Sequence, residues 1–208
     1  KTYGVSNSQK EAFSATTTSN ARTGSNSINV TQIAQEQRSV SGAFASSSAS
    51  LNGGSAITLS MVIGASSTTT TNIVVNEPTL ASTVTAINNA NLGVTAEIVD
   101  TGGNGDNYRI QLIGSTGAEK AFSLTSDESS LSFSSVQSAS DANITLNGID
   151  FTRSTNVIDD VLTGVTLTLN GTTSGAASLA INQDNSEARA NIVDFVTIYN
   201  EAKRQLDE

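Results

Sequence analysis

The repeated alternation of apolar residues with Ser, Thr and Asn is the feature that most constrains the fold of this chain. The clearest case is the stretch "NITLNGIDFTR" (143–153), in which two alternating apolar pairs flank Asn147-Gly148. Alternation at period two is typical of strands with one buried face, and Asn-Gly is favoured in type I′ hairpin turns. The sequence therefore predicts a β-hairpin here. It also predicts a chain that folds, because a disordered Ser/Thr-rich stalk would lack such apolar runs.

Similar patterns predict most of the remaining elements. Residues 1–27 are polar and weakly periodic, with Phe13 as the main candidate for an apolar anchor. Further strands are expected within 27–42, 56–65, 68–77, 94–100, 108–115, 130–138, 157–172 and 178–184. The strands at 56–65 and 68–77 are expected to form a hairpin. A helix is expected at about 79–91, because Leu80, Val84 and Ile87 recur at helical spacing. Pro78 and Thr79 are start signals, and Gly93 is a candidate C-terminal cap. The predicted fold class is mainly β with a few helices, a β-rich α+β fold.

The stretch "VDTGGNGDNYRI" (99–110) resembles a ligand-binding loop more than any other part of the chain. A phosphate-binding loop requires a helix directly after the glycines, whereas a strand is expected here. A divalent cation held by Asp100, Asp106 and backbone carbonyls is an alternative, because such ions prefer oxygen ligands. The favoured interpretation is a hairpin at about 94–113 whose loop uses glycine for positive φ.

Composition excludes several classes of function. The chain has no Cys and no His, which removes thiolate metal sites, disulfides and imidazole acid–base chemistry. Its net charge of −9 disfavours nucleic acid and anionic membranes as partners. Asp159 and Asp160 are adjacent on an extended chain and would point to opposite faces, so a paired acid–base role is not expected. We expect no catalytic residues, no cofactor and no metal site, and therefore not an enzyme.

The last segment (185–208) is predicted to be a helix, opened by a capping box of Asp184 and Glu187. Its apolar residues recur at steps of three and four, the spacing of a coiled-coil or bundle seam. The predicted packing seam consists of Ile192, Phe195, Tyr199 and Leu206. Because the chain stops at Asp207-Glu208, with acids at the negative end of the helix dipole, we expect the helix to continue in a longer parent protein.

Four segments in order resemble the bacterial flagellar filament cap family, hook-associated protein 2 (FliD). They are "SINVTQIAQEQRSVSGAFAS", "LASTVTAINNANLGVTAEIVDTGGNGDNYRIQLIGSTG", "DANITLNGIDFTRSTNVIDDVLTGVTLTLNGTTSG" and "NIVDFVTIYNE". The second resembles the flagellin hook IN motif, a helix that ends in Ile-Asn before a Val-Thr-Ala strand, which other flagellar proteins also carry. The third resembles the start of the family's carboxy-terminal region and is the most specific of the four.

The resemblance implies two antiparallel β-sandwich or sheet-type head domains, one inserted into the other, above a helical leg. Residues 1–43 and 140–184 would form the discontinuous head domain nearer the leg. Residues 44–139 would form the inserted outer domain with the hook IN motif, and 185–208 the start of the leg helix. The small-residue loop near 43–50 agrees with that boundary.

The resemblance also implies a structural function. Family members form a ring-shaped homo-oligomer at the distal tip of the filament, outside the cell, where they retain exported flagellin and promote its assembly. The expected partners are the protein itself and flagellin. Because some members bind host mucin, a surface adhesin is an alternative. Another hook-IN-containing axial protein, either a flagellin or a hook–filament junction protein, is a further alternative.

Overall fold

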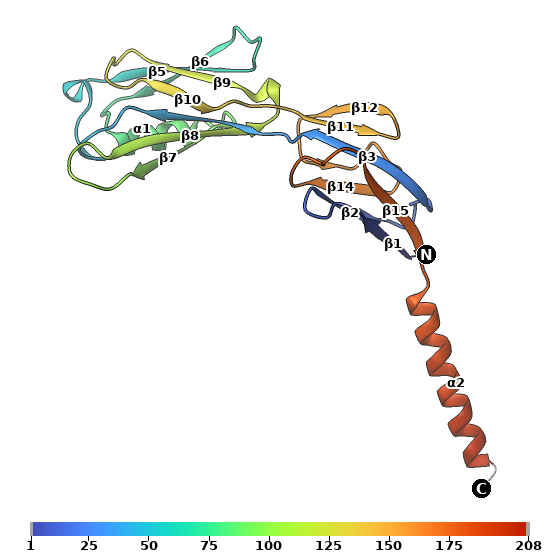
Figure 1. The fold of residues 1–208 in the computed structure, drawn as a ribbon. Helices are drawn as coiled ribbons and strands as arrows, with labels where there is room; N and C mark the ends of the chain where they lie inside the picture. Colours follow the sequence, from blue (N-terminus) through green and yellow to red (C-terminus); the bar gives the residue numbers. More distant parts are fainter. Residues whose placement is uncertain (1, 207–208) are drawn as a thin grey trace. The chain divides into compact units, whose positions relative to one another are not determined.

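The computed structural model describes residues 2–206, apart from the side chain of residue 187 (Figure 1). The chain forms two compact units. Unit 1 comprises the chain up to Val30, the segment Thr145–Phe151 and the chain from Val157 onward. Unit 2 comprises Thr31–Ile144 and Thr152–Asn156, so its sequence interrupts that of unit 1.

Unit 1 is built on two antiparallel sheets. The larger has the strand order β1 (Thr2–Asn7), β15 (Ala177–Asp184), β3 (Gly24–Gln32), β11 (Ala142–Leu146), β12 (Ile149–Arg153). The smaller has the order β13 (Val157–Ile158), β14 (Val165–Leu169), β2 (Phe13–Thr17). Alternate side chains of β11, β14 and β15 are buried, and Phe13, Ile28 and Leu167 are among the largest that are fully enclosed. Phe13 is therefore an anchor of the core, as predicted.

Unit 2 also has two sheets and contains helix α1 (Leu80–Asn89). One sheet has the order β10 (Phe133–Gln137), β4 (Glu36–Ser41), β8 (Tyr108–Thr116), β7 (Thr95–Asp100). The other has the order β6 (Thr70–Val75), β5 (Ile57–Ile63), β9 (Phe122–Ser126). Short 3₁₀ turns lie at Asn52–Gly54 and Ala118–Lys120. One apolar cluster, which includes Leu59, Met61, Leu80 and Ile110, joins both sheets to the helix.

Helix α1 follows its sequence signals closely at one end and differs at the other. Thr79 caps the first turn by a reciprocal pair of hydrogen bonds with Ser82, and the apolar face packs on β7 and β6. At the C-terminal end, Asn91 already adopts a left-handed conformation (φ 50°), two residues before the predicted cap, Gly93 (φ 79°). Asn tolerates this region better than other non-glycine residues, so the helix ends earlier than a glycine-based prediction allows.

The predicted fold class, mainly β with a few helices, is confirmed, as are three hairpins. The hairpins are β5–β6, β7–β8 and β11–β12, the last turning at Asn147 (φ 50°) and Gly148 (φ 83°). The single strand expected at 27–42 is instead two strands, β3 and β4, in different sheets. Residues 1–27 also contain two strands, β1 and β2, which their weak periodicity did not reveal.

The expected three-part domain division stays a prediction, but the units place three segments differently. Residues 31–43, 140–144 and 152–156, grouped above with the discontinuous domain, lie in unit 2. For the first of them, the longest of the three, the strand pairing explains the difference, because β4 forms its sheet with β10 on one side and β8 on the other.

Helix α2 (Ser186–Leu206) forms the end of the described chain. The Asp184 side chain accepts a hydrogen bond from the backbone N–H of Ser186 at 2.9 Å. The Ser186 side chain first, and then this backbone group, holds the pKa of Asp184 below its ordinary value. The other half of the predicted capping box, the Glu187 side chain, lies outside the described residues, as do Asp207 and Glu208. Neither described helix is long and apolar enough to cross a membrane.

Thr83 gives a first test of the unit 2 core. Its side chain is fully buried on α1, and its hydroxyl has no hydrogen-bond partner among the described residues. A buried hydroxyl without a partner costs free energy that a methyl group of similar size does not. We therefore expect Thr83→Val to stabilise the chain by about 1 kcal/mol. Urea unfolding followed by circular dichroism measures this, with the exposed Thr85→Val as a control, and a destabilised Thr83→Val variant would contradict the expectation.

Candidate interaction surfaces

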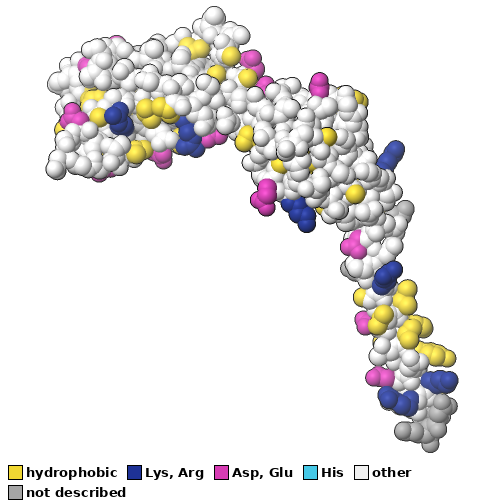
Figure 2. All heavy atoms as spheres, viewed as in Figure 1, with side chains coloured by type: hydrophobic (Ala, Val, Ile, Leu, Met, Phe, Trp, Pro, Cys, Tyr) yellow, Lys and Arg dark blue, Asp and Glu magenta, His cyan; other side chains and the backbone are white. Residues whose placement is uncertain are grey.

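Helix α2 carries the largest group of exposed apolar side chains in the described chain. The four residues of the predicted seam are all on its surface: Ile192 is 62% exposed, Phe195 68%, Tyr199 60% and Leu206 85%. Figure 2 shows hydrophobic side chains gathered along this helix. The rings of Phe195 and Tyr199 stack on one another, with centroids 6.5 Å apart. The role of these residues as a packing seam stays a prediction.

The apolar surface of α2 is wider than the predicted seam. Val193, Val196 and Ile198 are also exposed, at 62%, 47% and 65%. Val196 follows Ile192 by four residues and precedes Tyr199 by three, so the helical spacing used for the seam also identifies it. Val193 and Ile198 lie away from that line, and only their exposure in the structure reveals them.

The 101–107 loop is organised by Asp100. One oxygen of its carboxylate accepts hydrogen bonds from the Gly102 N–H at 2.9 Å and from the Asn107 side chain at 2.7 Å. The backbone N–H and the side-chain hydroxyl of Thr101 both donate to the Asn107 carbonyl. The flanking strands pair in register to Asp100 and Tyr108, so the predicted hairpin is confirmed.

The cation alternative gains no support from this geometry. One of the two Asp100 carboxylate oxygens already accepts the two hydrogen bonds that close the loop. Asp106 is exposed, and nowhere in the described part of the chain do three Asp or Glu residues group as a metal site would require. Asp159 and Asp160 are also exposed, after β13.

Carboxamide side chains fasten segments that no strand pairing joins. In each of four cases, the amide oxygen accepts from a backbone N–H and the amide nitrogen donates to the carbonyl of the same residue, as a neighbouring strand would. The pairs are Gln9 with Ser174, Gln37 with Phe122, Asn88 with Ala96, and Asn156 with Ala34. The first lies in unit 1 and the other three in unit 2. Periodicity gave no sign of them, because each is a single polar residue.

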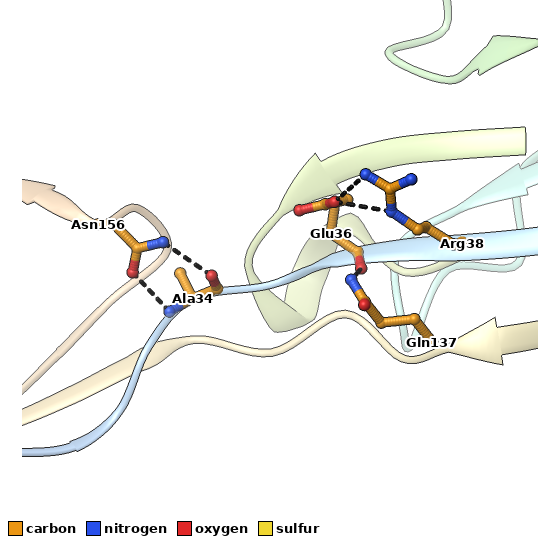
Figure 3. Close-up of polar contacts among 5 residues, drawn as sticks. All are labelled: Ala34, Glu36, Arg38, Gln137 and Asn156. Carbon is orange, nitrogen blue, oxygen red and sulfur yellow. Dashed lines mark hydrogen bonds and ion pairs between the residues drawn. The ribbon is translucent and has the colours of Figure 1, made fainter. Parts of the chain in front are cut away.

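One of these pairs belongs to a polar cluster around the segment that leads into β4 (Figure 3). Asn156 contacts Ala34 at 2.7 and 2.8 Å, and the Gln137 side chain donates to the Glu36 carbonyl at 2.7 Å. Arg38 donates twice to the Glu36 carboxylate. The segment is thus held from several sides by side chains of unit 2.

The Glu36 carboxyl has a pKa below its ordinary value, first because of a hydrogen bond with its own backbone and then because of Arg38. A lowered carboxyl pKa contributes stability that is present above the ordinary value and is lost as the pH falls through the lowered one. The pair is partly exposed, at 27% for Glu36 and 39% for Arg38, so solvent screens it and its contribution is small.

Comparison with known proteins identifies the family. Residues 139–208 match the family model described as flagellar hook-associated protein 2 C-terminus. A solved structure of the D2–D3 domains of the flagellar cap protein FliD from Escherichia coli is 30% identical, with a TM-score of 0.76, and the alignment covers 88% of this chain and 99% of that one. The chain belongs to the flagellar cap protein (FliD) family.

Two further family members are longer than this chain, which matches only part of each. A structure of the D1–D2–D3 domains of E. coli FliD is 31% identical with a TM-score of 0.76, and covers 96% of this chain and 62% of that one. Flagellar hook-associated protein 2 of Helicobacter pylori (strain ATCC 700392 / 26695) is 40% identical over 75 residues. Those residues are 35% of this chain and 11% of the relative, so the match concerns a small part of that protein.

The pattern that carried the family resemblance contains Asn156, in the stretch "RSTN". No role for this residue was predicted from the pattern. In the structure its side chain accepts from the Ala34 N–H and donates to the Ala34 carbonyl. Asn88 of the hook IN motif acts in the same way on Ala96, joining the end of α1 to β7.

Proposed function

We propose that the parent protein of this chain is a structural cap of the bacterial flagellar filament. In this role it forms a ring of identical subunits at the distal tip, outside the cell, retains exported flagellin and promotes its assembly without catalysis. The observation that carries the proposal is the match to the FliD D2–D3 domains over 88% of this chain. Under this proposal 44–139 is the outer head domain, and 1–43 with 140–184 is the head domain nearer the leg.

The exposed apolar side chains of α2 support a packing role for this helix within the parent protein. A helix with this much apolar surface in water is expected to bury it against another element. A larger share of this chain aligns with the E. coli structure that includes D1 than with the one limited to D2–D3. We therefore assign 185–208 to the start of a leg helix, with Ile192, Phe195, Tyr199 and Leu206 as its seam.

The proposal is tested by deleting the parent gene and quantifying flagellin in the medium and on the cells. We expect flagellin monomers in the medium and absent or stunted filaments, both restored by the intact gene. Normal filaments on the deleted strain would reject the cap function and favour a surface adhesin.

The seam is tested in the same strain with two charge-matched alleles. Phe195→Asp places a charge in the seam, whereas Thr197→Asp places one on the opposite side of α2. We expect Thr197→Asp to restore filaments and Phe195→Asp to fail, with equal amounts of both proteins secreted. Full restoration by Phe195→Asp would show that this residue does not pack in the leg, while leaving the cap function unaffected.

A further inference from the structure

The chain contains four Asn-Gly dipeptides, at Asn52, Asn104, Asn147 and Asn170. This dipeptide has a specific chemistry, because a glycine after Asn has no Cβ to keep its backbone nitrogen away from the Asn side chain. In that chemistry the glycine nitrogen attacks the Asn side-chain amide, with loss of ammonia. The reaction requires that the glycine N–H and the Asn side-chain amide are both free of hydrogen bonds that hold them in place. The structure distinguishes the four sites on this basis.

Three of the four are restrained by hydrogen bonds. The Asn147 side chain accepts from the Ser27 N–H and donates to the Asn26 side chain, each at 2.9 Å. At Asn170 the attacking group itself is occupied, because the Gly171 N–H donates to the Ala12 carbonyl at 2.9 Å. The amide of Asn52 donates to two carbonyls of its own turn, at 3.2 and 3.3 Å.

Asn104 differs from all three. It lies at the tip of the 101–107 loop, between Gly103 and Gly105, and is exposed. The hydrogen bonds among Asp100, Thr101, Gly102 and Asn107 close the base of the loop and do not reach its tip. Neither Asn104 nor Gly105 makes a hydrogen bond to any other described residue, and a Cβ built on Gly105 would have nothing within 4 Å.

We propose that Asn104 is a site of spontaneous deamidation in the folded protein. The backbone nitrogen of Gly105 attacks the Asn104 side-chain carbonyl carbon and forms a five-membered succinimide. The bond from that carbon to the side-chain nitrogen breaks, and this nitrogen leaves as ammonia with the proton lost by Gly105. Water then opens the ring at either carbonyl, giving aspartate or isoaspartate. No oxidant or reductant is consumed.

The modification changes the loop chemically. Each event adds one carboxylate to a chain whose net charge is already −9. The isoaspartate product also routes the main chain through the former side chain, which inserts an additional carbon into the backbone of the loop. The covalent structure of the 101–107 loop therefore changes with time, whereas conversion at the other Asn-Gly sites is slower in the folded chain.

The test compares each site in the folded and in the denatured chain. The 208-residue chain is incubated at mildly alkaline pH, with and without concentrated urea, then digested and mapped by mass spectrometry. At Asn104 we expect the same rate in both conditions. At Asn52, Asn147 and Asn170 we expect folding to slow the reaction at least about tenfold, the factor that corresponds to one hydrogen bond that must break first.

Two variants make the comparison specific. Asn104→Gln should abolish conversion at this site, because its longer side chain forms the ring far less readily, and leave the other three rates unchanged. Asn26→Ala removes one partner of the Asn147 amide and should accelerate conversion at that site alone. Protection of Asn104 by folding, or conversion of another site at the same pace in the folded chain, would overturn the proposal.

Discussion

Replacing Gly164 by alanine should destabilise unit 1 by about 3 kcal/mol, the combined cost of a left-handed alanine and of overpacking. Gly164 lies directly before β14 and has φ +70°. A Cβ there would lie 2.5 Å from the Ala21 nitrogen and 2.7 Å from the Asn20 carbonyl carbon. Both are backbone atoms of the turn after β2, which Thr18 fastens by donating to the Gly164 carbonyl. The turn cannot move without loosening the β2–β14 pairing.

Alanine variants of two other glycines in the same unit serve as controls that distinguish conformational strain from the steric clash. Gly171 has no positive φ and nothing within 4 Å of a built Cβ, so Gly171→Ala should change stability by no more than about 0.5 kcal/mol. Gly148 has φ +83° and equally open space, so Gly148→Ala should cost about 1 kcal/mol from strain alone. Urea unfolding followed by circular dichroism measures all three. A Gly164→Ala variant no worse than Gly148→Ala would show that the close approach does not matter.

Replacing Gln37 by leucine should destabilise unit 2 by about 3 kcal/mol, because two buried backbone groups lose their partner at once. The Gln37 side chain is 9% exposed and lies on β4. Its amide accepts from the Phe122 N–H at 3.0 Å and donates to the Phe122 carbonyl at 2.7 Å. This contact joins β4 to β9 across the two sheets of the unit.

The matched control is Gln111→Leu. Gln111 lies on β8, is half-buried, and its side chain makes no hydrogen bond to the described residues. We expect a change within about 0.5 kcal/mol. Gln37→Glu adds a sharper test. The introduced carboxyl keeps the acceptor but donates to Phe122 only when protonated, so its stability deficit should shrink as the pH falls. A deficit that does not depend on pH would argue against the paired hydrogen bonds.

Sequence reasoning succeeded where local chemistry decides the outcome. The Asn147-Gly148 turn, the alternation in β5 and the Thr79 cap each depend on residues within a few positions of one another. It missed β1, because this strand lies at a sheet edge and its burial does not alternate. It merged β3 with β4, because both alternate and only their partners differ.

The candidate surfaces were predictable to different degrees. The helical spacing of Ile192, Phe195 and Tyr199 identified part of an exposed apolar surface on α2. The carboxamide pairs could not be found in this way. Gln37 and Asn156 act on backbone groups 85 and 122 residues distant, and nothing in their neighbours distinguishes them from the many other Asn and Gln residues of the chain.

The position of β15 in its sheet has a consequence for how the chain acquires its structure. β15 lies between β1 and β3, and it pairs Asp184 with Thr2, which is 182 residues away in the sequence. Contacts so distant in sequence form slowly, because the intervening chain must first lose its freedom. Unit 2 is nearly continuous and can fold as soon as it is complete. In unit 1, β1 and β3 can complete their sheet only after β15 pairs with both. Folding of unit 1 is therefore expected to be slower than folding of unit 2.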